Sequence, residues 1–136
     1  MGILDKAINK TKSSINTSST KVAETKEVSK LEAQMKEEKS KVRDLYEDLG
    51  QEYYRFTVDK DDEHKKNMLT LIDKINESRK IIEDCEAQIE DVRDKYKEER
   101  ENIKAEAEAR DKEIDEADEQ ARAEKEAAKK EKEDLF

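Results

Sequence analysis

Two side chains in this sequence belong to the types that most often do chemistry, and each type occurs once: His64 and Cys85. A lone histidine among charged neighbours is typical of a solvated side chain, because catalysis and metal binding need further groups to orient or complete the site. Cys85 falls in a repeating row of apolar residues, which predicts a small core residue of low reactivity. A single cysteine also excludes an intramolecular disulfide and a CxxC zinc site.

Other motifs that carry chemistry are missing from the sequence. The many acidic residues do not form the Asp-x-Asp-x-Asp-Gly pattern of a calcium loop, and there is neither a glycine-rich phosphate loop nor a nucleophile elbow. We therefore predict no catalytic residues, no metal site and no cofactor. The chain is not expected to be an enzyme.

The composition leaves helix or disorder as the structural alternatives. Of the 136 residues, 49% are charged, 32% are hydrophobic and none is proline. This composition favours helix over sheet, but it is also polar enough for a disordered chain. The net charge of −9 argues against binding to nucleic acid, because phosphates would be repelled.

Heptad spacing decides in favour of helix. Residues 28–56 and 68–96 each carry apolar side chains at the a and d positions of four repeats, and three polar residues (Glu38, Glu52 and Ser78) interrupt the d rows. The a positions are Val28, Met35, Val42, Leu49 and Phe56 in the first segment, and Met68, Ile75, Ile82, Ile89 and Tyr96 in the second. A reversal about residue 62, inside the polar connection 57–65, would bring these rows face to face.

We therefore predict an all-α fold, a long antiparallel helical hairpin of the coiled-coil type. Its parts are a basic amphipathic or flexible leader (1–27), the hairpin (28–96) with its turn near 59–63, and an acidic helical extension (97–136). Residues 1–30 carry a net charge of +3 and residues 97–136 a net charge of −6, so the chain is basic at one end and acidic at the other.

The stretch LYEDLGQEYYRF, residues 45–56, suggests how copies of the hairpin associate. It gathers three of the four tyrosines and one of the two glycines. Glycine inside a helix costs ~1 kcal/mol relative to alanine, so it often marks close approach by another helix. We predict docking of two hairpins through their turn ends into a four-helix bundle, by way of Tyr46, Leu49, Gly50, Tyr53 and Tyr54. The alternative is a monomer whose tyrosines shield its own seam.

Three interpretations of the first 27 residues stay open. A basic amphipathic helix could contact an anionic membrane surface through Ile3, Leu4, Lys6, Ile8, Lys10, Lys12 and Ile15. Alternatively, Ile8, Ile15 and Val22 could continue the seam and face residues 116, 109 and 102, in which case truncation of the acidic tail should release the helix and increase membrane binding. The third interpretation is a loosely ordered leader. No apolar run approaches the ~18 residues of a membrane span, and we expect a cytoplasmic protein, peripheral at the membrane under the first interpretation.

The motifs MGILDK, LYEDLGQEYY and IIEDCEAQIEDVRDKY resemble those of a poorly characterised group of small helical-hairpin proteins from Gram-positive bacteria. Many members of that group end in a zinc ribbon, but here an acidic helix follows the second arm and no CxxC pair is present. The resemblance implies a bacterial source. The chain also resembles, more weakly, the phage-shock and ESCRT-III-like hairpins, whose first helix binds membranes.

Together these features predict a non-enzymatic structural or adaptor protein that acts through helix–helix association. Its expected partners are further copies of itself, another protein or an anionic membrane surface. The alternative function is that of a peripheral membrane hairpin of the phage-shock type, held by its N-terminal amphipathic helix.

Overall fold

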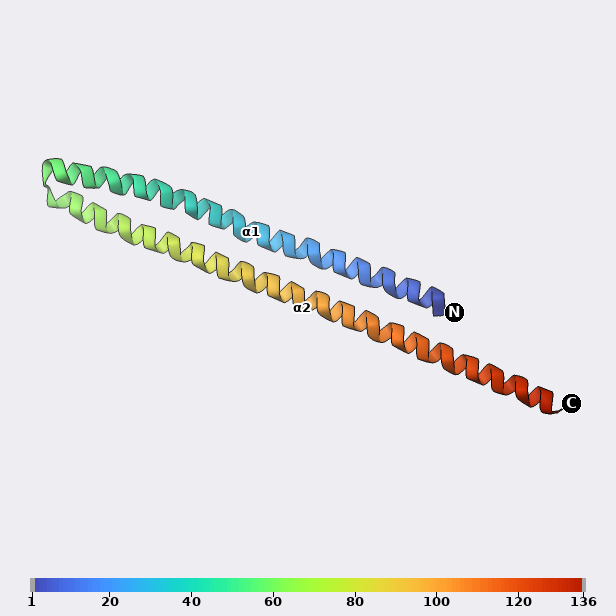
Figure 1. Cartoon of the computed structure of the whole chain (residues 1–136). Coiled ribbons are helices and arrows are strands. Elements are labelled where there is room, and N and C mark those ends of the chain that lie inside the picture. Colours follow the sequence, from blue (N-terminus) through green and yellow to red (C-terminus); the bar gives the residue numbers. More distant parts are fainter. Residues whose placement is uncertain (1, 136) are drawn as a thin grey trace. The chain divides into compact units, whose positions relative to one another are not determined.

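The computed structural model describes residues 2–135 and contains two helices and no strand over that range (Figure 1). Helix α1 spans Gly2–Asp59 with 58 residues, and α2 spans Asp62–Asp134 with 73 residues. The predicted all-α helical hairpin is therefore confirmed. The chain divides into two compact units, a turn unit of Glu24–Asp94 and a terminal unit of Met1–Ala23 with Lys95–Phe136. Each unit is described by itself below.

The turn is tighter than the sequence indicates, because α1 and α2 extend into the connection and leave only Lys60 and Asp61 outside helix. Lys60 has a φ of 55° and its N–H donates to the carbonyl of Phe56 at 2.8 Å, which closes the end of α1 with a left-handed residue. Asp61 then caps α2, since its Oδ1 accepts the N–H of Glu63 at 3.0 Å. The chain thus reverses slightly before the expected midpoint at residue 62.

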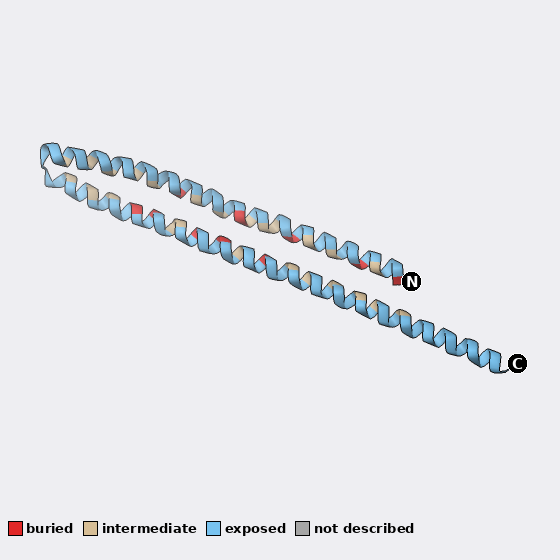
Figure 2. Ribbon diagram, in the orientation of Figure 1, coloured by how far each residue is buried: buried red, intermediate tan, exposed pale blue. Residues whose placement is uncertain are grey.

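The heptad rows form the core of the turn unit, as their spacing predicts. Every a and d residue from Val28 to Phe56 on α1, and from Met68 to Val92 on α2, is buried or half-buried (Figure 2). Ile75 and Ile89 are among the most buried apolar residues, and Cys85 is the most enclosed, with 2% of its surface exposed. Two-helix contact along one narrow seam therefore supplies the whole core of this unit.

The terminal unit is built differently, because its α1 segment turns a polar side toward α2. The buried and half-buried residues on this side are Gly2, Lys6, Asn9, Ser13, Thr17, Thr20 and Ala23. Asn9 donates from its side-chain nitrogen to the carbonyl of Ala107 and to Asp111, both at 2.9 Å, and Lys6 pairs with Asp115 at 2.6 Å. Residues 119–135 of this unit are all exposed.

The prediction that Ile8, Ile15 and Val22 lie on the seam is wrong. They are exposed to 51%, 62% and 70%. Val22 precedes the seam residue Val28 by six positions rather than seven, and at 3.6 residues per turn this moves the row about 120° around the helix. The basic start does pair with the acidic stretch of α2, but through small and polar side chains, and its apolar row faces away.

Candidate functional site: the turn-end surface

Large apolar side chains are exposed on both helices close to the turn. Those exposed on α1 are Tyr46, Tyr53, Tyr54 and Val58, and those exposed on α2 are Leu69 and Ile72. A hairpin so short of apolar residues would bury these if its own seam had room. Their exposure shows that one copy of the chain does not cover them.

Two contacts across the seam show which of these residues share a side of the hairpin. Arg79 donates from Nη1 to the Tyr46 hydroxyl at 3.3 Å, and Arg93 lies 3.9 Å from Glu32. Each of these four residues directly follows a d residue and so occupies heptad position e. The e positions of α1 therefore face the e positions of α2. By the same register, one heptad nearer the turn, Tyr53 lies opposite Ile72.

Gly50 lies between Tyr46 and Tyr53 on this side of α1, four residues after one and three before the other. A Cβ placed on Gly50 would have no atom of the chain within 4 Å, apart from its immediate helix backbone. The glycine is therefore not required for contact between α1 and α2. It leaves an open notch flanked by two exposed tyrosines, and we call Tyr46, Gly50, Tyr53, Leu69 and Ile72 the turn-end surface.

The five predicted self-association residues divide among three places. Tyr46, Gly50 and Tyr53 come together on the turn-end surface. Leu49 is half-buried in the seam of its own hairpin, and Tyr54 is exposed, about 100° farther around α1 than Tyr53. Leu69 and Ile72 complete the surface from α2, and the signal for them in the sequence is a pair of apolar residues close to the d residue Leu71.

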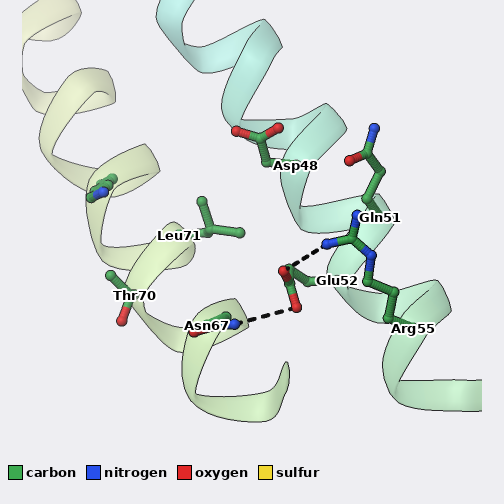
Figure 3. Close-up of a pocket in the computed structure, with 8 residues that line it drawn as sticks. Asp48, Gln51, Glu52, Arg55, Asn67, Thr70 and Leu71 are labelled. Carbon is green, nitrogen blue, oxygen red and sulfur yellow. Dashed lines mark hydrogen bonds and ion pairs between the residues drawn. The ribbon is translucent and has the colours of Figure 1, made fainter. Parts of the chain in front are cut away.

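The opposite side of the turn unit carries a polar hollow rather than an apolar patch (Figure 3). It is lined by Asp48, Gln51, Glu52, Arg55, Asn67, Thr70, Leu71 and Lys74. Glu52 accepts bonds there from Arg55 at 3.3 Å and from Asn67 at 3.5 Å. These ion pairs and amide contacts orient side chains about the turn, and they bring no nucleophile and base together.

His64 is not the solvated side chain that its sequence context predicts. Its Nδ1 lies 2.7 Å from Oε2 of Glu52, and its Nε2 lies 3.4 Å from Oδ2 of Asp59. The hydrogen bond to Glu52 is the largest cause of a raised His64 pKa; burial, the next largest effect, opposes it, and the Asp59 carboxylate adds a smaller increase. The same bond lowers the pKa of Glu52.

Glu38 makes a second polar site within the seam. One carboxylate oxygen pairs with Lys41 at 3.2 Å, and the other is buried without a hydrogen bond of good geometry. Ser78 is the largest cause of the lowered pKa of Glu38, followed by Lys41. The d-row interruptions at Glu38 and Ser78 are therefore both buried in the seam, and the Ser78 hydroxyl helps to keep the Glu38 carboxylate ionised.

The residues predicted to contact a membrane also divide, although all lie in the terminal unit. Ile3, Leu4, Ile8 and Ile15 are exposed, as are Lys10 and Lys12, whereas Lys6 is turned toward Asp115. Within residues 2–135, no helix has a stretch both long and apolar enough to cross a membrane. Over the same residues, no group of three or more His, Cys, Asp or Glu side chains could hold a metal ion.

Comparison of the chain with protein-family models, with curated proteins and with solved structures found no match.

Proposed function

We propose that this chain is a non-enzymatic coiled-coil adaptor that self-associates through the turn-end surface. The observation that carries the proposal is the exposure of Tyr46, Tyr53, Leu69 and Ile72 around the open notch at Gly50. Aromatic side chains supply much of the energy of protein interfaces, and a missing side chain lets a second helix approach closely. A second copy presents the same surface, so a two-fold axis through the notch would cover both.

The test is the molar mass of the full chain in solution, measured by light scattering at tens of micromolar. We expect two chains per particle for the wild type and one for Gly50→Leu. Because the space beside Gly50 is open, leucine fits the single hairpin without a clash, and loss of the dimer would report on the interface itself. Ala33→Leu, which adds a leucine at an exposed position of α1 far from the turn, is the matched control and should stay dimeric. A wild type that remains monomeric contradicts the proposal.

The alternative function, peripheral attachment to an anionic membrane, is favoured by a separate observation. The apolar row of residues 3–22 is exposed although this segment is paired with α2, and Ile3 is exposed to 90%. Apolar burial from a few such residues gives marginal affinity, and lysines near an anionic surface add about 1 kcal/mol each. The acidic partner segment opposes this attraction, which is why self-association is our first proposal.

Vesicle flotation separates the two functions. Attachment predicts that the full chain floats with anionic vesicles in low salt and that Ile8→Asp together with Ile15→Asp abolishes flotation. The tail does not cover the apolar row, but its removal takes away negative charge and frees Lys6 from Asp115, so truncation should modestly increase binding. Failure of the wild type to float would leave only the adaptor. We further propose that the protein is bacterial and that it works in the cytoplasm.

A further inference from the structure

The only histidine of the chain lies between two carboxylates that belong to the other helix. His64 is in the first turn of α2, whereas Glu52 and Asp59 lie near the end of α1. Its two ring nitrogens each face one of them, at 2.7 Å for Glu52 and 3.4 Å for Asp59. One side chain therefore links the last two turns of α1 to the first turn of α2, across the turn of only two residues.

This arrangement suits one protonation state of the ring. An imidazolium has two N–H donors, so it can serve both carboxylates at once. A neutral imidazole has one donor and one lone pair, so one of the two carboxylates would then face an acceptor. The neutral ring can keep the shorter bond to Glu52 only by giving up the contact with Asp59.

We propose that His64 is a pH-dependent staple of the hairpin turn, which fastens α2 to both Glu52 and Asp59 when the ring is protonated and releases one of them when it is neutral. The proposal concerns the turn of a single chain and does not depend on whether copies associate.

Other charged and polar groups from both helices and the turn lie around the ring. Arg55 lies on Oε1 of Glu52 at 3.3 Å, and Asn67 approaches Oε2 at 3.5 Å. The backbone N–H of His64 donates to the carbonyl of Asp61 at 3.2 Å. The turn also carries Lys60, and Glu63 precedes the histidine. Among these residue types, histidine is the one whose ordinary pKa lies between about pH 6 and pH 8.

The sign of the effect follows from the direction of the shift. Glu52 first, and Asp59 after it, raise the pKa of His64 in the folded chain above its ordinary value of 6.5. A raised pKa means that the folded state binds the proton more tightly than the unfolded state. The stabilisation is thus complete below the ordinary value and disappears as the pH rises through the pKa of the folded chain.

Proton NMR of the full chain tests the geometry, because a single histidine gives a single pair of ring signals. We expect the pKa of His64 to be higher in the folded chain than in the urea-unfolded chain. Glu52→Gln and Asp59→Asn should each lower this pKa, and Glu52→Gln should lower it by more. A histidine that titrates alike in the folded and unfolded chain, or ignores both substitutions, would overturn the proposal.

Urea unfolding tests the staple itself. The wild-type midpoint should be lower at about pH 8 than at about pH 6, and His64→Gln should remove most of this difference. Lys66→Gln, two residues along α2 and exposed, is the control and should keep it. The pair of variants separates the histidine from other groups, such as the chain's terminal amine. Equal pH dependence in the wild type and in His64→Gln would contradict the staple.

Discussion

Tyr46 and Arg79, which are 33 positions apart in the chain, meet across the seam where the Arg79 guanidinium donates to the tyrosine hydroxyl at 3.3 Å. This contact shows the register of α1 against α2 on one side of the turn unit. It also keeps one edge of the Tyr46 ring occupied while the side chain remains about half exposed. A tyrosine held in this way loses less conformational freedom on binding, which favours its use in an interface.

The seam predicts a clear cost for removing a core side chain. Ile75→Ala should lower the free energy of unfolding by about 2 to 3 kcal/mol, toward the low end for isoleucine because a two-helix core can partly collapse around the gap. Ile75 is 5% exposed. Urea unfolding followed by circular dichroism measures the change, and Val22→Ala, at an exposed position, should change it by less than about 0.5 kcal/mol. Equal effects of the two substitutions would show that the seam is not the core.

The left-handed residue at the turn predicts a stabilising substitution. Lys60 adopts a φ of 55°, which is unfavourable for any residue with a Cβ. Lys60→Gly should raise the free energy of unfolding by up to about 1 kcal/mol, because the relief of this strain exceeds the greater flexibility of glycine in the unfolded chain. Thermal unfolding is the measurement. A loss of stability would mean that residue 60 does not adopt this conformation.

The polar contacts of the terminal unit predict what holds its α1 segment in a helix. A chain ending at residue 120 keeps Ala107, Asp111 and Asp115, so trypsin should still cut slowly after Lys10 and Lys12. A chain ending at residue 103 lacks all three partners, and cleavage at the two lysines should become fast, because a short unpaired helix is marginal in water. Equal cleavage rates in the two truncated chains would show that the pairing with α2 does not protect this segment.

The fold was predictable where the a rows of apolar residues are unbroken. Val28 to Phe56 and Met68 to Tyr96 keep a strict seven-residue interval, so both the helices and their buried sides follow from spacing alone. The buried side of residues 2–20 was not predictable in this way. There the apolar row departs from the interval by one residue, and polar side chains such as Asn9 form the contact instead.

The site was only partly predictable for a related reason. Spacing along α1 brings Tyr46, Gly50 and Tyr53 together, but the contribution of Ile72 depends on the register between two helices, which the turn sets. The surroundings of His64 depend on the same turn. Nothing in the local sequence shows that the chain reverses over only Lys60 and Asp61, and a longer loop would leave the ring in solvent.

The most direct test of self-association through the turn-end surface is the distance between identical spin labels on two chains, measured by pulsed electron paramagnetic resonance. Cys85 is replaced by alanine, and one label is placed either at Lys66, near the turn, or at Ala33, farther along the turn unit; both positions are exposed. Docking through the turn ends predicts a defined distance between chains that is shorter at Lys66 than at Ala33, and its loss in Gly50→Leu. The account is contradicted if no distance between chains is found, or if the labels at Ala33 lie closer than those at Lys66.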